Sequence, residues 1–75
     1  MKDMRGLEED IRSLYEQYAN DIYRYARLTL GDSSVAKDVV QEVFLRAFRS
    51  WEQFRSEANP RTWLMSITRN YLLSF

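Results

Sequence analysis

The sequence predicts an all-α fold, a compact three-helix bundle. In three successive segments apolar residues recur every three or four positions, which is the period of an amphipathic helix. No segment shows the polar–apolar alternation of a strand. The two glycines, Gly6 and Gly31, and the single proline, Pro60, interrupt the helical patterns. Because the connections are short, we expect neighbouring helices to pack roughly antiparallel.

The first helix is expected from about Leu7 to Leu30. Charged side chains occupy one of its faces, and Gly31 suits the left-handed position that often ends a helix. Asp32 or Ser33 can then cap the next helix. The apolar stripe, thickened by Tyr15 and Ala26, consists of Leu7, Ile11, Leu14, Tyr18, Ile22, Tyr25 and Thr29.

The second helix is expected from about Ser34 to Phe54. Its side chains divide between a buried stripe and an outward face that is mostly polar. The stripe consists of Ala36, Val39, Val40, Val43, Phe44, Ala47, Phe48, Trp51 and Phe54, and the outward residues are Asp38, Gln41, Glu42, Leu45, Arg46 and Arg49.

The third helix is expected to start with Asn59 as its N-cap and Pro60 at its first position, where a missing N–H costs nothing. No glycine, lysine or proline closes this helix, which indicates that it is cut short at the end of the chain. We expect Trp63, Leu64, Ile67, Tyr71, Leu72 and Phe75 to be buried, and Arg61, Ser66, Arg69 and Asn70 to face outward.

Composition excludes several classes of function. The 75 residues suffice for one small domain and contain no cysteine, which rules out disulfides and thiolate metal sites and fits a reducing cytoplasm. There is no histidine, the commonest general base and metal ligand. The acidic cluster at residues 8–10 suits a helix start better than a metal site. We therefore expect no catalytic residue, no metal and no cofactor. A signal peptide and a membrane span are also missing from the sequence.

The formal net charge is zero, but the charges are unevenly distributed. Residues 1–42 carry six basic and nine acidic side chains, whereas residues 43–75 carry five arginines and two acidic side chains. A neutral total argues against strong autonomous binding to DNA, which is largely electrostatic. The basic C-terminal half permits weak or assisted binding, and random surface charge is the alternative explanation.

Two surfaces are candidates for function. On the second helix, Leu45 stands among polar residues at helical steps, an arrangement that suits docking onto another helix, although a solvated charged face explains it equally well. In the C-terminal segment, arginines can reach phosphates, Asn70 can bond a base edge, and aromatic rings can receive unstacked bases. For the aromatic rings the alternative is core packing. The residues of this second surface are Arg55, Arg61, Ser66, Arg69 and Asn70, with Trp51, Phe54 and Trp63 nearby.

Several motifs resemble region 2 of a bacterial extracytoplasmic-function (ECF) sigma factor of the sigma-70 family. They are D-V-V-Q-E-V-F-L-R-A-F at residues 38–48, F-R at 54–55 and R-T-W-L-x-x-I-x-R-N at 61–70. The segment Y-E-Q-Y-A-N-D-I-Y-R-Y-A-R-L-T-L-G-D at 15–32 is similar to the preceding helix of that domain. Each motif alone is weak, but their order and spacing together are specific.

The resemblance implies a single region 2 domain that docks on RNA polymerase and that recognises and melts the −10 element of a promoter for transcription initiation. Residues 1–13 would be an N-terminal extension or the start of the first helix, 14–31 the first helix, 32–54 the polymerase-docking helix, and 55–75 the loop and helix that read the −10 element. The implied contacts with the β′ clamp coiled coil are Asp38, Gln41, Glu42, Leu45 and Arg49. The implied contacts with the non-template strand are Phe54, Arg55, Asn59, Arg61, Thr62, Trp63, Ser66, Arg69 and Asn70.

Within this implied strand-binding surface, residues 54–62 would form a loop that captures a flipped base. Arg61 and Arg69 would meet phosphates, and Asn70 would contact a base at the upstream edge of the element. Family resemblance also implies an anti-sigma factor as a partner. A helical module whose main role is to bind such a protein is the alternative function.

Three features depart from the family pattern. Lys37 replaces a usual acidic residue, so the docking face is less negative than expected. Pro60 sits at the junction of loop and helix, where it affects the shape of the loop. The chain ends at Phe75, before the second domain that reads the −35 element in the family. We therefore expect this chain to be the first domain of a larger factor.

Overall fold

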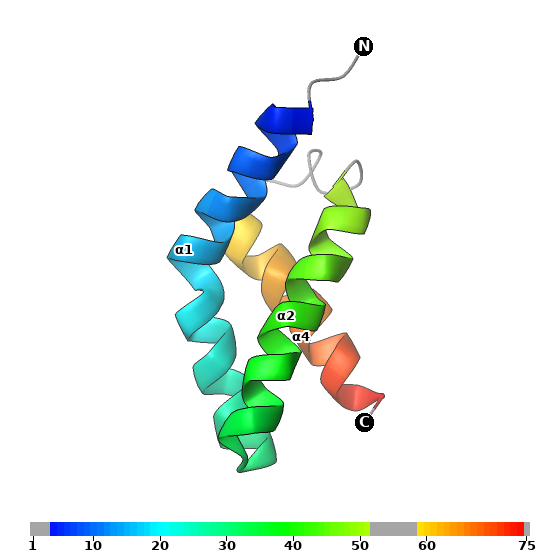
Figure 1. The fold of residues 1–75 in the computed structure, drawn as a ribbon. Coiled ribbons are helices and arrows are strands. Elements are labelled where there is room, and N and C mark those ends of the chain that lie inside the picture. Colours follow the sequence, from blue (N-terminus) through cyan, green and yellow to red (C-terminus); the bar gives the residue numbers. More distant parts are fainter. Residues whose placement is uncertain (1–3, 52–58, 75) are drawn as a thin grey trace.

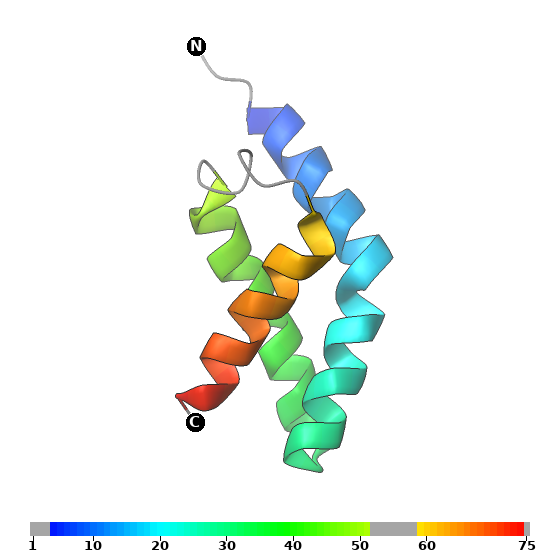
Figure 2. The ribbon, with the colours of Figure 1, turned by 180° about the vertical axis from the view of Figure 1, so that it is seen from behind.

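The computed structural model describes residues 4–51 and 59–74, with side chains from Glu9 onward. Its described part consists of three helices: α1 (Met4–Leu30), α2 (Ser33–Arg49) and α4 (Pro60–Leu73). In Figure 1, α1 and α2 lie side by side and run in opposite directions, and α4 lies behind them. Figure 2 shows from the other side how α4 crosses α1 and α2. The predicted all-α three-helix bundle is confirmed.

The turn between α1 and α2 forms as the local sequence predicts. Gly31 adopts a φ of 75°, a left-handed conformation that is easiest for glycine, and its N–H donates to the carbonyl of Arg27 at 2.8 Å. Asp32 is the N-cap of α2, and its carboxylate accepts from the N–H of Val35 at 3.0 Å. Of the two candidate caps, Asp32 is therefore the one used.

The start of α4 is also confirmed. Asn59 is the N-cap, and its side-chain oxygen accepts from the N–H of Thr62 at 3.0 Å. Pro60 occupies the first turn, where the helix needs no N–H from it. These two residues fix the direction in which α4 enters the bundle.

The core lies where the three helices meet. Its fully buried side chains include Ile22 from α1, Val39 and Val43 from α2, and Leu64 from α4. The predicted stripe of α2 is buried over most of its length, but Phe48 is 36% exposed because it lies at the edge of the helix interface. The buried apolar set is Leu14, Ile22, Ala26, Ala36, Val39, Val40, Val43, Phe44, Ala47 and Leu64.

The predicted stripe of α1 is wrong at Thr29. After Ile22 the buried face continues to Ala26, which was predicted to widen the stripe, and to the partly buried Leu30, in steps of four residues that match the 3.6-residue turn. Tyr25 is partly buried as well. Thr29 is exposed, and its hydroxyl donates to the carbonyl of Tyr25 at 2.8 Å. A step of three or four residues along the sequence does not tell whether Thr29 or Leu30 faces the core.

Two further expectations need correction. Helix α2 ends at Arg49, whereas the sequence favoured a helix through Phe54. The N–H of Ser50 is shared between the carbonyls of Arg46 and Ala47, at 3.0 and 3.2 Å, which tightens the last turn and ends the helix. In α4, Thr68 is fully buried although it was not expected to be; its hydroxyl donates to the carbonyl of Leu64 at 2.8 Å, which removes the cost of burial.

Candidate functional site

The outward face of α2 carries the residues that the sequence singled out for docking. Asp38, Gln41 and Arg49 are exposed, and Glu42 is partly exposed. Leu45 has 51% of its surface exposed. All five therefore lie on the side of α2 that does not contribute to the core, as expected.

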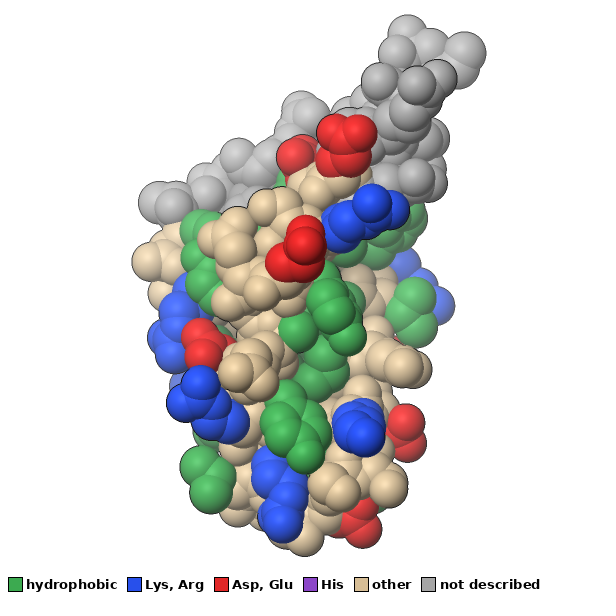
Figure 3. Space-filling model, turned by 60° about the vertical axis from the view of Figure 1, so that its left-hand side comes forward, with side chains coloured by type: hydrophobic (Ala, Val, Ile, Leu, Met, Phe, Trp, Pro, Cys, Tyr) green, Lys and Arg blue, Asp and Glu red, His purple; other side chains and the backbone are tan. Residues whose placement is uncertain are grey.

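Leu45 does not stand alone on this face. A groove of about 420 Å³ runs beside it between α1 and α2, and its lining is mostly apolar. The ring of Tyr15 packs on that of Phe44, with a centroid distance of 4.9 Å. Figure 3 brings the α1 side of the molecule forward and shows hydrophobic side chains between acidic and basic ones on that side. The residues that line the groove are Ile11, Tyr15, Gln41, Phe44, Leu45 and Phe48.

Arg46 connects the outward face of α2 with α4, a role that the sequence did not reveal. Its Nε atom donates to Oε2 of Glu42 at 3.0 Å, an ion pair between residues one helical turn apart. Its guanidinium carbon lies 4.7 Å from the centroid of the Tyr71 ring in α4, within the range of a cation–π interaction. The four-residue spacing of Glu42 and Arg46 was a usable signal for the ion pair. Nothing in the sequence identified the contact with Tyr71.

The outward face of α4 is basic and polar. Arg69 and Asn70 are exposed, as expected, and so are Arg61 and Thr62. Arg61 also contacts the first helix, because its Nε atom lies 3.4 Å from the Oδ2 atom of Asp21. This ion pair has to open before Nε of Arg61 can donate to a phosphate.

Three of the residues expected to contact DNA have structural roles in the bundle. Ser66 is only partly exposed, and its hydroxyl donates to the carbonyl of Trp63 at 2.7 Å. Trp63 is half-buried and packs edge-on against Trp51, with centroids 6.3 Å apart. Asn59 caps α4 with its side chain. The sequence predicted both tryptophans to be buried, with a ligand surface as the alternative, and this contact favours packing.

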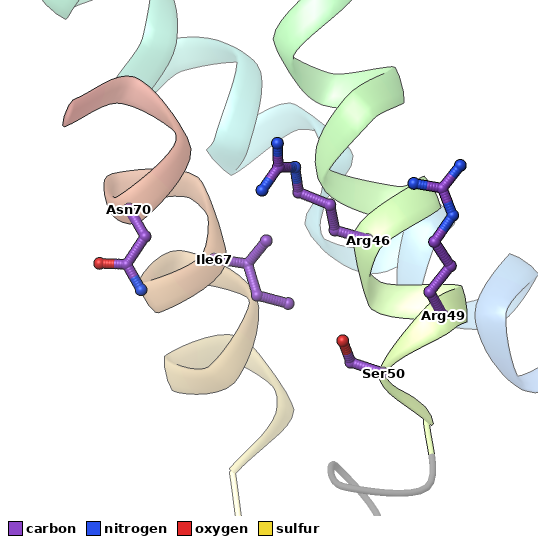
Figure 4. Close-up of a pocket in the computed structure, with 5 residues that line it drawn as sticks. All are labelled: Arg46, Arg49, Ser50, Ile67 and Asn70. Atoms are coloured by element: carbon purple, nitrogen blue, oxygen red, sulfur yellow. The ribbon is translucent and has the colours of Figure 1, made fainter. Parts of the chain in front are cut away.

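A second groove separates α2 from α4. It has a volume of about 240 Å³ and is lined by Arg46, Arg49, Ser50, Ile67 and Asn70. In Figure 4, Arg46 and Ile67 reach into the space between the two helices, Arg49 extends along α2, and Asn70 lies on the outer side of α4. The same groove is thus lined by Arg49, expected to contact a protein, and by Asn70, expected to contact DNA.

Two of the candidate residues, Phe54 and Arg55, lie outside the described residues, as does most of the predicted base-capturing loop. The described residues contain no group of three or more acidic or other ligand-type side chains arranged to hold a metal ion. None of the helices in the described part combines the length and the apolar character needed to cross a bilayer.

The chain is similar to known bacterial proteins over most of its length. Residues 14–75 match the family model for sigma-70 region 2. The chain is 41% identical over 64 residues to the ECF RNA polymerase sigma factor SigL of Mycobacterium tuberculosis, covering 84% of this chain and 36% of SigL. It is 30% identical over 69 residues to the ECF RNA polymerase sigma factor SigX of Bacillus subtilis, covering 92% of this chain and 36% of SigX.

The ECF RNA polymerase sigma factor SigM of Bacillus subtilis is 29% identical over 65 residues, which cover 87% of this chain and 39% of SigM. The chain thus spans little more than a third of the length of these relatives. The matched part includes all three motifs on which the resemblance rests. The chain belongs to the sigma-70 region 2 family, in the group of the ECF RNA polymerase sigma factors.

Proposed function

We propose that this chain is a non-enzymatic promoter-recognition domain that docks on RNA polymerase through α2 and reads the −10 element through α4. The observation that carries the proposal is the pair of dissimilar outward faces on one small bundle. The face of α2 combines Asp38 and Glu42 with the exposed apolar Leu45, whereas α4 presents Arg69 and Asn70. The proposed site of action is the cytoplasm, where bacterial RNA polymerase works.

The α2 face has the chemistry of a surface for a helical partner. An apolar contact at Leu45, with carboxylates and an amide around it, matches the core-and-rim arrangement of protein interfaces. We propose the β′ clamp coiled coil as the partner, with Asp38, Gln41 and Glu42 as the main contacts. Basic side chains on the partner would meet the two carboxylates.

The α4 face has the chemistry of a surface for single-stranded DNA. Arg69 supplies charge for a phosphate, and the amide of Asn70 can make two hydrogen bonds to a base edge. Arg61 joins them once its ion pair with Asp21 opens. Because a domain tethered to polymerase gains effective concentration, a net charge of zero is compatible with such binding.

Binding of the 75-residue chain to two ligands in parallel tests the proposal. One ligand is the polymerase clamp coiled coil, and the other is a single-stranded −10 oligonucleotide selected from a random pool. Glu42→Lys should weaken binding to the coil at least about tenfold, because it places like charges opposite each other. Asn70→Ala should remove the sequence preference for the oligonucleotide while leaving binding to the coil unchanged.

One control variant matches the charge reversal, and one measurement checks the fold of every variant. Glu16→Lys reverses an exposed charge on α1, outside both faces, and should alter neither binding event. Circular dichroism should show the same helix content for all variants. A chain that is folded but binds neither ligand would contradict the proposal and leave a resemblance of fold alone.

A second candidate function is binding of a partner such as an anti-sigma factor. The apolar groove between α1 and α2 favours it, because Tyr15, Leu45 and Phe48 expose apolar surface there. This groove adjoins the proposed polymerase face through Gln41 and Leu45, so a protein seated in it would block docking. Under this alternative, Asn70→Ala should leave function intact.

A further inference from the structure

We propose that the groove between α2 and α4 binds a backbone phosphate of single-stranded DNA, with Arg46 and Arg49 as its positive side chains. The inference rests on the proposed function and extends the DNA-binding surface from α4 onto α2. It also moves Arg49 from the expected polymerase contacts to the DNA contacts. Arg46 was in neither set.

The charge of the groove suits an anion. Its lining contains two arginines, the hydroxyl of Ser50 and the amide of Asn70, and no acidic side chain. Arginine presents a planar set of N–H donors that matches two oxygens of a phosphate at once. In Figure 4, Arg46 points across the space toward α4, whereas Arg49, which also lines the groove, extends along the opposite side of α2 in this view.

Arg46 is held in position before any ligand arrives. Its Nε atom donates to Glu42 at 3.0 Å, and its guanidinium lies 4.7 Å from the centroid of the Tyr71 ring. Both contacts fix the long side chain, so less rotamer freedom is lost on binding. The remaining N–H bonds of the guanidinium belong to its two terminal amino groups, which the contact with Glu42 through Nε does not use.

The groove has room for more than a lone ion. Its volume of about 240 Å³ exceeds the share of several water molecules, at roughly 30 Å³ each. Ile67 gives it an apolar side on which a sugar can rest. Asn70 belongs both to this groove and to the outward face of α4. A strand whose base meets Asn70 can therefore place a neighbouring phosphate between the helices.

Affinity of the chain for a single-stranded oligodeoxythymidylate of about ten nucleotides tests the inference. Fluorescence anisotropy would be measured over a series of NaCl concentrations. Arg46→Gln and Arg49→Gln should each weaken binding about three- to tenfold at low salt. Each should also reduce the slope of log affinity against log salt by about 0.7, the loss of one phosphate contact on a single strand. Arg46→Lys keeps the charge and should retain most of the slope.

Arg24→Gln is the matched control, because Arg24 is exposed on α1 and lies outside the groove. It removes the same charge and should leave the slope unchanged. Equal losses for Arg24→Gln and Arg46→Gln would mean that only net charge matters, and would overturn the inference. An acidic peptide that binds as tightly as the oligonucleotide, with the same dependence on Arg46, would overturn it as well.

The two proposals fail in different ways. Suppose that the chain prefers the −10 oligonucleotide and that this preference depends on Asn70. If the Arg46 and Arg49 variants then bind single-stranded DNA with the same affinity as the unsubstituted chain, the groove proposal is wrong and the proposed function stands. If the chain binds neither oligonucleotide, the DNA half of the proposed function fails together with the groove.

Discussion

Helices α2 and α4 pack against the same core but bury very different numbers of side chains. Helix α2 buries six side chains along one face, whereas α4 buries only Leu64 and Thr68. The other inward side chains of α4 are half-buried: Trp63, Met65, Ile67, Tyr71 and Leu72. Helix α2 is therefore a fixed element with one solvent-exposed face, while the position of α4 depends on few fully buried side chains.

Contacts at the edges of α4 supplement its small buried face. Trp63 packs against Trp51, Tyr71 faces Arg46, and Arg61 pairs with Asp21. The aromatic pair contributes about 0.5–1.5 kcal/mol, and each of the two exposed contacts contributes about 1 kcal/mol or less. The proposed DNA-reading helix is therefore held by one fully buried leucine, by partly buried apolar side chains and by weak contacts at its edges.

The largest effect is expected from Leu64→Ala. Leu64 is fully buried, and truncation of a buried leucine lowers the free energy of unfolding by about 2–5 kcal/mol. A domain of this size has a total stability of roughly 4–11 kcal/mol, so the loss is a large fraction of it. Urea denaturation followed by circular dichroism measures the change.

Leu73→Ala is the control within the same helix. Leu73 is 79% exposed, so the same chemical change should alter the free energy of unfolding by no more than about 0.5 kcal/mol. A loss below about 1 kcal/mol for Leu64→Ala would show that α4 is held chiefly by its edge contacts, contrary to the comparison above.

A smaller effect is expected at the helix caps. Asp32→Ala and Asn59→Ala each remove a side-chain acceptor from a helix N-terminus, which costs about 1 kcal/mol. We expect one loss of stability to be local and the other to affect the whole fold. Hydrogen exchange should speed up at the N–H of Thr62 in Asn59→Ala by local fraying, because the first turn of α4 has little buried support.

In α2, buried Ala36 and Val39 follow the cap closely, so the loss in Asp32→Ala should appear mainly as lower global stability. Asn59→Asp keeps the acceptor and should restore slow exchange at Thr62. Equal local fraying at both caps would remove the distinction between the two helices.

The sequence predicted well those features that depend on neighbours along the chain. The N-caps are Asp32 and Asn59, and Pro60 occupies a first helical turn, as is common for these residue types. Gly31 adopts the expected left-handed conformation. The buried face of α2 was also predictable, because valines and alanines at helical spacing leave a single choice of face.

Features that depend on packing between helices were not predictable. The burial of Thr68 requires α4 to present that position to the core, and its hydroxyl is satisfied within its own helix. The contact of Arg46 with Tyr71 joins residues from two helices, and no spacing along the chain indicates it. The same holds for Arg61 and Asp21, which lie forty residues apart. The sequence predicted most of the outward residues of α2 and α4, but not which of them already have partners.

The smallest effect on stability is expected from Asp21→Asn. The pair with Arg61 joins α1 to α4 at 3.4 Å, and both side chains are substantially exposed, at 57% for Arg61 and 37% for Asp21. Its loss should lower the free energy of unfolding by no more than about 0.5 kcal/mol, and the difference should vanish in about 1 M NaCl.

The same substitution should strengthen binding to single-stranded DNA, because it removes a carboxylate that competes with phosphate for Arg61. Arg61→Gln should weaken that binding, and in its presence Asp21→Asn should have a smaller effect. An unchanged affinity in Asp21→Asn would mean that Arg61 keeps α4 in place and does not contact the strand.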